Sequence, residues 1–268
     1  MKHLICLFFL LLSGCAPLKA KEKPQVSQFT LEQFLLEQEQ RDHALTSVEG
    51  KLRVRYAVKQ GSFAGAAKLI KYEHQSRFEV SDPMGRVRYW IIGDPKNILA
   101  FYESDKTAYL SSEGGKNYFR RFYGMALDWE ELLSLWMGIL PASWRKNVGD
   151  SWDYSEGSYK GVVRDRTNHS VSFEVSEEKR QLIRLVFKQD KNEIQVSLND
   201  FDACCAQGKK ESILGHGVEI KLPKSSEKIE LEWEELNILE QIPNPLVFSK
   251  KLPGGIKLVN LEKEQKHE

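Results

Sequence analysis

The stretch Val48-Glu49-Gly50-Lys51-Leu52-Arg53-Val54-Arg55-Tyr56-Ala57-Val58 decides the fold. Its even-numbered positions are apolar or glycine, and most of its odd-numbered positions carry a charge. Because successive side chains of a strand point to opposite faces of a sheet, this alternation predicts a strand with one buried face and one solvated face. The rest of the chain has to supply the strands that pair with it.

Short strands joined by tight turns follow this first strand toward the C-terminus. Asp82-Pro83-Met84-Gly85 and Gly93-Asp94-Pro95-Lys96-Asn97 are two of the turns, since Pro presets φ and Gly permits a positive φ. No helical pattern separates these strands, so we expect an antiparallel meander. Its further strands are expected at residues 63–69, 77–81, 87–92, 98–102 and 107–110.

Two helices are expected beside the strands. Thr30 and Gln33 have the spacing of a capping box, and the apolar residues after them predict an amphipathic helix over about 31–45. Asp128 can cap a second helix that ends at Pro141, directly after an aromatic and basic segment at 117–125. The second helix is apolar around most of its circumference, which fits either plain burial in a core or a position across an apolar cavity.

The strand pattern resumes after the second helix and continues almost to the end of the chain. Ile229, Leu231 and Trp233 alternate with glutamates in the clearest of these segments. The further strands are expected at residues 152–154, 158–164, 171–175, 182–188, 193–198, 217–222, 229–238 and 256–261. Residues 263–268 form a charged tail.

The N-terminus has the pattern of an export signal. Lys2 precedes an apolar run over residues 4–12 that is too short to span a bilayer, so residues 1–14 are interpreted as a signal peptide. Leu12-Ser13-Gly14-Cys15 resembles the bacterial lipobox, which implies that Cys15 is lipidated and becomes the new N-terminus. Ala16, in place of Asp, implies sorting to the outer membrane, with residues 15–29 as a flexible tether. The alternative is an ordinary secretory signal with an unmodified Cys.

Composition narrows the function classes. The chain is 41% hydrophobic and 29% charged, as in an ordinary globular protein, and it has no second apolar stretch long enough to cross a bilayer. It carries 39 Lys and Arg against 38 Asp and Glu. This near-neutral balance gives no electrostatic footprint for nucleic acid, so no nucleic-acid partner is expected.

Motifs for catalysis and metal binding are missing from the sequence. It contains no nucleophile elbow, Walker loop, dinucleotide fingerprint or His-Glu-x-x-His sequence, so we predict that the protein is not an enzyme and has no catalytic residues or cofactor. Cys204 and Cys205 are adjacent, which disfavours a disulfide between them. No further Cys or paired His lies near them, so no metal site is predicted.

Three motifs together carry a resemblance to a known family. They are Gly50-Lys51-Leu52 at the start of the meander, Asp82-Pro83-Met84-Gly85 at a hairpin, and Leu135-Trp136-Met137-Gly138-Ile139-Leu140-Pro141 after a lid-like segment. In this order they resemble the LolB family of outer-membrane lipoprotein receptors, within the LolA/LolB-like lipoprotein superfamily. The similarity runs from about residue 45 to 200 and, with insertions, to 261.

The resemblance implies a fold and a function. The fold is mainly β (α+β), an open antiparallel half-barrel of about 11 strands in which covering helices enclose an apolar cavity. It occupies residues 30–262, with an insertion around 189–222. The implied partners are a LolA-like periplasmic carrier, a triacylated lipoprotein cargo and the outer membrane. Burial of each CH₂ contributes about 0.8 kcal/mol, so acyl chains need shielding on their way through water.

The resemblance also implies site residues. Apolar side chains from the strands and from the second helix would line the acyl-chain cavity: Leu52, Val54, Tyr56, Phe63, Leu69, Phe78, Val80, Tyr89, Ile91, Leu132, Leu135, Trp136 and Ile139. Plain core packing is an equally good interpretation of each. Met84, at the tip of a polar turn, would help deliver the cargo to the membrane; the alternative is that it folds back onto the sheet.

Two other functions fit the same sequence. One is a binding module of the same fold for another lipid or glycolipid. The other is a structural envelope-assembly lipoprotein whose interior is a filled core. A cavity of several hundred Å³ favours a binding function, whereas a filled interior favours the structural one.

Overall fold

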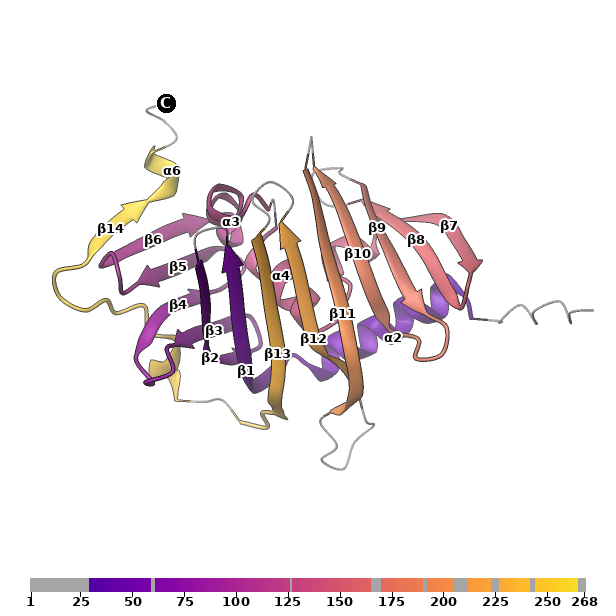
Figure 1. Ribbon diagram of the computed structural model, residues 1–268, viewed down its shortest axis with the longest axis horizontal. Helices are drawn as coiled ribbons and strands as arrows, with labels where there is room; N and C mark the ends of the chain where they lie inside the picture. The colour runs from indigo at the N-terminus through magenta and orange to yellow at the C-terminus, as the bar shows by residue number, and fades with distance from the viewer. Residues whose placement is uncertain are drawn as a thin grey trace, which may run out of the picture.

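Figure 1 shows a single large β-sheet with helices packed against one of its faces. The computed structural model describes residues 29–58, 61–125, 127–164, 170–189, 192–204, 212–222, 227–241 and 244–264. The expected signal peptide, Cys15, most of the tether, Cys205 and the end of the charged tail lie outside the described residues. Within this part of the chain, no helix has both the length and the apolar composition that a membrane span requires.

Fourteen strands form the sheet in the part of the chain that the structure describes. They are β1 (Ser47–Val58), β2 (Gly61–Tyr72), β3 (Gln75–Ser81), β4 (Val87–Gly93), β5 (Asn97–Tyr102), β6 (Thr107–Ser112), β7 (Val148–Ser155), β8 (Ser158–Arg164), β9 (Ser170–Ser176), β10 (Leu182–Gln189), β11 (Asn192–Cys204), β12 (Ser212–Leu222), β13 (Glu227–Ile238) and β14 (Lys257–Asn260). Their order in the sheet is β14-β6-β5-β4-β3-β2-β1-β13-β12-β11-β10-β9-β8-β7, and the sheet does not close.

The expected strand count needs correction. We expected about 11 strands, and the described residues form 14. Most of the segment 189–222, expected as an insertion, belongs to β11 and β12, which pair with each other and extend the sheet. The sheet is also not purely antiparallel, since β14 runs parallel to β6.

The sheet is built around β1, the strand that the alternating pattern predicts. On one side β1 pairs with β2, and on the other it pairs with β13, which lies far along the chain. Leu52 and Val54 are buried on the inner face. On the outer face, Lys51 Nζ lies 2.6 Å from Glu235 Oε2 and Arg53 Nη1 lies 3.1 Å from Glu232 Oε2. Exposed ion pairs of this kind contribute little stability, so burial of the inner face holds this pairing together.

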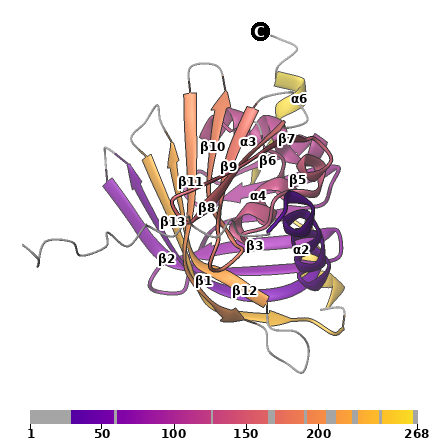
Figure 2. The ribbon, with the colours of Figure 1, turned by 90° about the vertical axis from the view of Figure 1, so that its right-hand side faces the viewer.

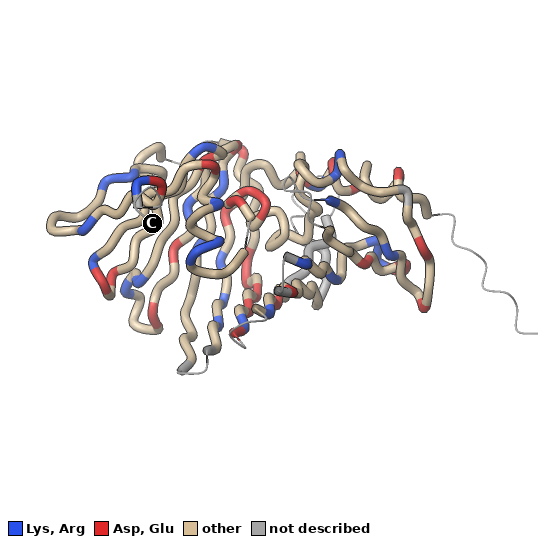
Figure 3. The backbone as a smooth tube through the Cα atoms, turned by 90° about the horizontal axis from the view of Figure 1, so that it is seen from above, with Lys and Arg blue, Asp and Glu red and all other residues tan. Residues whose placement is uncertain are grey.

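Charges of both signs are interspersed along the chain, as Figure 3 shows. Neither sign gathers over one half of the sheet. This arrangement matches the near-neutral net charge of the sequence.

The helices cover the concave face of the sheet (Figure 2). They are α2 (Leu31–Ala44), α3 (Lys116–Tyr123), α4 (Trp129–Trp136) and α5 (Ala142–Arg145), with the 3₁₀ turn η1 (Glu113–Gly115) directly before α3. The C-terminal part of the chain adds the 3₁₀ turn η2 (Pro245–Phe248) and the short helix α6 (Leu261–Glu264), which lies beside β6. The capping box of α2 is confirmed, because Gln33 N donates to Thr30 Oγ1 at 3.2 Å and Thr30 N donates to Gln33 Oε1 at 3.1 Å. The start of the charged tail is helical, since α6 includes Lys263.

The second expected helix is shorter than predicted. Asp128 caps α4 as expected, but α4 ends at Trp136 and not at Pro141. Gly138 adopts a positive φ of 69°, and Ile139 N donates to Ser134 O at 2.9 Å, which closes the helix. Ile139 therefore lies beyond α4 and not on it.

α2 covers the β7–β9 end of the sheet with an aromatic cluster. Phe34 stacks on Phe173, with ring centroids 5.6 Å apart, and Trp152 stacks on Tyr159 at 5.0 Å. Phe29, which we expected in the tether, is buried in this cluster, and its carbonyl accepts a hydrogen bond from Trp152 Nε1 at 3.1 Å. Aromatic side chains thus fill this end of the concave face.

A second apolar cluster lies on the outer face of β4 and β5, where the C-terminal segment covers it. Its buried members are Trp90, Ile92, Leu99, Phe101 and Ala108, and Leu252 and Ile256 pack against them. Arg77 lies over the ring of Trp90, 5.4 Å from its centroid, and donates from Nη1 to Val247 O at 3.1 Å. β4 and β5 are therefore buried on both faces, which explains their nearly continuous apolar sequence.

Gly93 allows the sheet and α4 to approach closely, which gives a first prediction. A Cβ at this position would lie 2.3 Å from Trp129 Cδ1. Gly93→Ala should therefore displace Trp129 and lower the free energy of unfolding by about 1–3 kcal/mol. Urea denaturation followed by tryptophan fluorescence measures this loss. Gly149→Ala is the matched control, since the nearest atom to its Cβ is Val162 O at 3.5 Å; equal stability losses in both variants would contradict the prediction.

Candidate functional site

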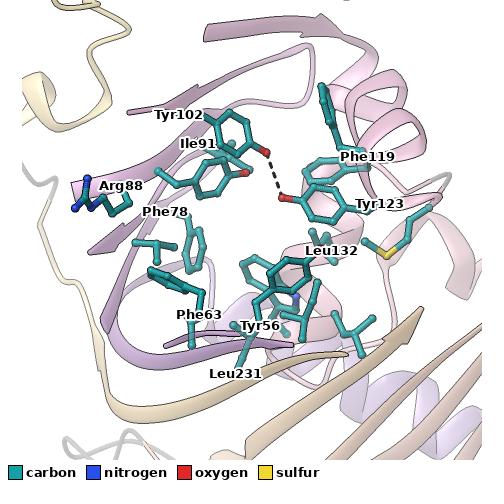
Figure 4. Close-up of a pocket in the computed structure, with 18 of the residues that line it drawn as sticks. Tyr56, Phe63, Phe78, Arg88, Ile91, Tyr102, Phe119, Tyr123, Leu132 and Leu231 are labelled. Atoms are coloured by element: carbon teal, nitrogen blue, oxygen red, sulfur yellow. Dashed lines mark hydrogen bonds between the residues drawn. The ribbon is translucent and has the colours of Figure 1, made fainter. Parts of the chain in front are cut away.

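An apolar pocket of about 470 Å³ lies between the sheet and the helices α3 and α4 (Figure 4). Strands β1 to β5, β12 and β13 form one side and the two helices the other. The pocket is lined by Val54, Tyr56, Phe63, Phe78, Val80, Arg88, Tyr89, Ile91, Tyr102, Ser104, Phe119, Phe122, Tyr123, Met125, Trp129, Leu132, Trp136, Ile220, Ile229 and Leu231. Its size falls within the range of small-molecule sites, roughly 300–1,000 Å³.

Residue spacing explains why these side chains meet. Val54 and Tyr56 are two positions apart on β1, as are Phe78 and Val80 on β3, so each pair shares the inner face of the sheet. On α4, Trp129, Leu132 and Trp136 are three and four positions apart and share one face of the helix. The expected alternation of the strands therefore produces the wall of the pocket.

The structure brings nine of the thirteen predicted cavity residues to this pocket. They are Val54, Tyr56, Phe63, Phe78, Val80, Tyr89, Ile91, Leu132 and Trp136. The other four do not line it: Leu52, Leu69, Leu135 and Ile139 are fully buried in the main core. In the structure these four side chains belong to the packed core beside the pocket.

Sequence reasoning missed the other lining residues for two reasons. Phe119, Phe122 and Tyr123 lie in the aromatic segment that the sequence singles out, and their spacing of three and four positions places them on one face of α3. Their helical spacing was the signal that could have found them. Ile220, Ile229 and Leu231 reach the pocket only because β13 pairs with β1, and no local pattern encodes that pairing.

Aromatic packing fixes the floor of the pocket. Trp129 stacks on Phe119 with centroids 5.9 Å apart, and it meets Trp136 edge to face at 5.5 Å. The Trp129 indole Nε1 donates to Ser76 Oγ at 2.5 Å. This hydrogen bond ties α4 to the start of β3 and holds the ring against the sheet.

Three tyrosines of the mostly apolar wall form a hydrogen-bonded group with Tyr118, which is buried behind them. Tyr89 and Tyr118 are hydrogen-bonded at 3.1 Å, Tyr118 is also hydrogen-bonded to Tyr102, and Tyr102 lies 3.4 Å from the Tyr123 hydroxyl. Figure 4 shows the hydroxyls of Tyr102, from β5, and Tyr123, from α3, pointing toward one another. Burial raises the pKa of Tyr89, Tyr102 and Tyr118 well above the ordinary value for a phenol, so all three stay neutral.

The predicted delivery residue, Met84, lies at an exposed turn beside the pocket. Its side chain is 79% exposed, so it does not fold back onto the sheet. Asp82 holds the turn, because its Oδ1 accepts hydrogen bonds from Met84 N and Arg86 N, each at 3.0 Å. Asp82 Oδ2 accepts from Nε of Arg88, a pocket-lining residue, also at 3.0 Å. The turn is thereby connected to the rim of the pocket.

The charge on Asp82 is stabilised by its partners. Desolvation raises its pKa, but the hydrogen bonds from the Arg86 backbone and from the Arg88 and Arg86 side chains outweigh this, and the pKa lies below its ordinary value. Arg88 in turn donates to Glu103 Oε2 at 2.6 Å. The positive charge at the rim is therefore matched by two carboxylates.

An open, mainly antiparallel sheet that holds an apolar pocket beneath helices defines the class of fold. No protein-family model and no curated protein matches the chain. Solved structures do share the fold. A LolA superfamily protein from Nitrosomonas europaea is 13% identical, with a TM-score of 0.54 over 83% of this chain and 98% of the other.

Two further structures have the same architecture. A domain from Vibrio parahaemolyticus, named for outer membrane lipoprotein sorting, is 10% identical, with a TM-score of 0.57 over 80% of this chain and 94% of its own. A DUF1329 family protein from Desulfovibrio piger is 9% identical, with a TM-score of 0.60 over 82% and 97%. At these identities the similarity shows a common fold.

The Asp82 network gives a prediction about pH. Because the pKa of Asp82 is depressed in the folded state, its carboxylate stabilises the fold fully above its unfolded pKa of about 3.9. This stabilisation is lost as the pH falls through the lower folded-state pKa. We expect a ¹³C NMR titration of the Asp82 carboxyl to show a midpoint below the ordinary value, and Arg86→Gln with Arg88→Gln to raise it. A titration midpoint of wild-type Asp82 at or above the ordinary pKa of an aspartate would contradict this interpretation.

Proposed function

We propose that this protein is an outer-membrane-anchored lipoprotein that accepts other lipoproteins from a periplasmic carrier and inserts them into the outer membrane. The pocket is the observation that carries the proposal. A space of about 470 Å³ lined almost entirely by apolar and aromatic side chains is suited to an acyl chain, and a filled core would not leave it. The fold shared with a LolA superfamily protein and with a lipoprotein-sorting domain supports the same conclusion.

The proposed transfer needs no nucleotide. Each CH₂ that leaves water contributes about 0.8 kcal/mol, so an acyl chain moves directly from one apolar site to another that binds it better. A LolA-like carrier would present the triacylated cargo at the mouth of the pocket, where Phe122 is exposed and Tyr56 and Phe63 are half-buried. The phenyl and indole rings of the wall, with Met125, provide an adaptable apolar surface for flexible chains.

Delivery is assigned to the turn that carries Met84. An exposed apolar side chain on a rigid polar turn can enter the interface of a bilayer, and this turn adjoins the rim of the pocket through Asp82 and Arg88. The N-terminal lipid on Cys15 would keep the pocket within reach of the membrane. The protein would then face the periplasm from the outer membrane.

Acceptance of cargo is tested with a variant of the pocket wall. The mature chain with Cys15→Ser is mixed with carrier loaded with a lipoprotein, and co-purification of the cargo is measured. Phe63→Glu places a charge at the pocket, where an acyl chain would have to desolvate it, so uptake should fall at least tenfold. Ala64→Glu is the matched control, because Ala64 is exposed on the opposite face of the same strand. If no cargo moves to the folded wild-type protein, the receptor function is wrong.

Delivery to the membrane is tested separately. Met84→Glu should leave uptake unchanged and reduce transfer of bound cargo to liposomes severalfold, because a carboxylate resists entry into the bilayer. Leu246→Glu is the control, since Leu246 is 74% exposed in η2 and does not line the pocket. Equal transfer by the wild type and Met84→Glu would show that this turn has no part in delivery.

A further inference from the structure

Trp233 reaches from the sheet to the end of α4. It belongs to β13 and is only 3% exposed. The last four carbonyls of a helix have no partner inside the helix. In α4, the carbonyls at positions 133–135 accept hydrogen bonds from the backbone N–H groups of residues 137–139. The fourth, Trp136 O, accepts from Trp233 Nε1 at 3.1 Å. A strand side chain thus completes the hydrogen bonding of the helix end.

Gly50 makes room for the Trp233 indole. A Cβ at position 50 would overlap the Trp233 ring at Cζ3. β13 also carries a bulge relative to β1 between Lys51 and Leu52, and a bulge re-aims the side chains beside it. The Gly50-Lys51-Leu52 motif therefore seats an indole that comes from a distant part of the chain.

The N-terminal end of α4 is held in a similar way. Gly93 makes room for the Trp129 indole, whose Nε1 donates to Ser76 Oγ in β3 at 2.5 Å. One indole N–H thus connects each end of α4 to the sheet. The hydrogen bonds of Glu131 and Gln38, in contrast, join the helical segments to one another.

The two indole hydrogen bonds lie at the two ends of one pocket wall. Trp129, Leu132 and Trp136 line the pocket from α4, whereas Trp233 and Gly50 do not line it. Opposed apolar walls gain van der Waals contacts when they approach one another, so an apolar pocket tends to close unless its walls are held apart. A helix that is bonded to the sheet at both ends cannot settle onto it.

We propose that Trp233 is a positioning residue for the pocket: seated on Gly50, it holds the C-terminal end of α4 in place and keeps the pocket open before a ligand arrives. Trp233 acts through Trp136, whose carbonyl accepts the hydrogen bond and whose ring forms part of the wall. The inference rests on the proposed function in that the pocket receives an apolar ligand, and it names a residue that prepares the site without touching the ligand.

Binding of N-phenyl-1-naphthylamine, a fluorescent apolar probe, tests the role of Trp233. The mature Cys15→Ser protein and its Trp233→Phe variant are titrated with the probe. Phe has no N–H to donate, so the end of α4 is released and the open form of the pocket becomes less populated. Because the apparent affinity falls in proportion to the population of the open form, we expect a loss of about fivefold or more.

Trp90→Phe is the matched control. Trp90 is 7% exposed and belongs to the outer cluster, so the same substitution removes a buried indole on the other face of the sheet. The free energy of unfolding should fall in both variants, but the probe affinity of Trp90→Phe should stay close to that of the wild type. Unchanged probe affinity of folded Trp233→Phe, or an equal loss of affinity in the two variants, would overturn the proposal.

A double variant separates positioning from simple packing. Gly50→Ala alone should lower the probe affinity, because the added Cβ displaces the Trp233 ring. In the Trp233→Phe variant the displaced ring atom and the indole N–H are already gone, so Gly50→Ala should have a much smaller effect. Additive losses would show that the two residues act independently, which contradicts the proposal.

Hydrogen exchange in the wild type makes the test independent of variant folding. The Trp233 indole N–H should be as protected from exchange in the ligand-free protein as with the probe bound, because its bond to Trp136 O is present in both states. Exchange as fast as in free tryptophan before the probe is added would overturn the proposal. The outcome is separable from that of the proposed function: failed carrier-to-receptor transfer with a protected Trp233 and normal probe binding would refute the receptor role alone.

Discussion

An open sheet with one apolar face has to be covered by something other than itself, and this constraint governs the whole molecule. β1 has an apolar inner face and a charged outer face, and its neighbours follow the same division. Since the sheet does not close into a barrel, the helices have to shield the inner face from water. At the β7–β9 end, aromatic side chains beneath α2 fill the available space. Beneath α3 and α4 the fit is incomplete, and the remaining space is the pocket.

A few buried hydrogen bonds fix the positions of the helices that cover the sheet. The buried carboxylate of Glu131 accepts hydrogen bonds from Ser143 Oγ at 2.8 Å and Trp144 Nε1 at 3.0 Å, which join α4 to α5. Gln38 Oε1 accepts from Leu140 N at 2.8 Å and joins α2 to the segment after α4. Apolar packing alone would let these helices slide, whereas buried polar groups require specific partners. Hydrogen bonds outside the pocket thus help to hold α4, which forms part of its wall.

Local signals in the sequence predicted local structure well. The alternation in β1, the capping box of the first helix, the Asp128 cap of the second and the Asp82-Pro83-Met84-Gly85 turn are found as expected. The predicted end of α4 was wrong because Gly138, with its positive φ, terminates the helix although the residues after it are still apolar. The pairing of β1 with β13 could not be predicted, since nothing in either segment identifies its partner strand. For this reason Ile220, Ile229 and Leu231 were not predicted as pocket residues. The packing of Leu252 and Ile256 over Trp90 and Ile92 was missed for the same reason. Contacts between residues far apart in the chain produce no periodic pattern in the sequence.

The place of β13 in the sheet has a consequence for the order in which the protein forms. Lys51 and its partner Glu235 are 184 positions apart. β1 therefore has one unpaired edge until β13, near the end of the chain, has been synthesised. Closing such a long loop before any contact compensates for it is slow, and an exposed strand edge in that interval invites pairing with other chains. A protein that is proposed to shield acyl chains from water would thus itself depend on protection while it folds.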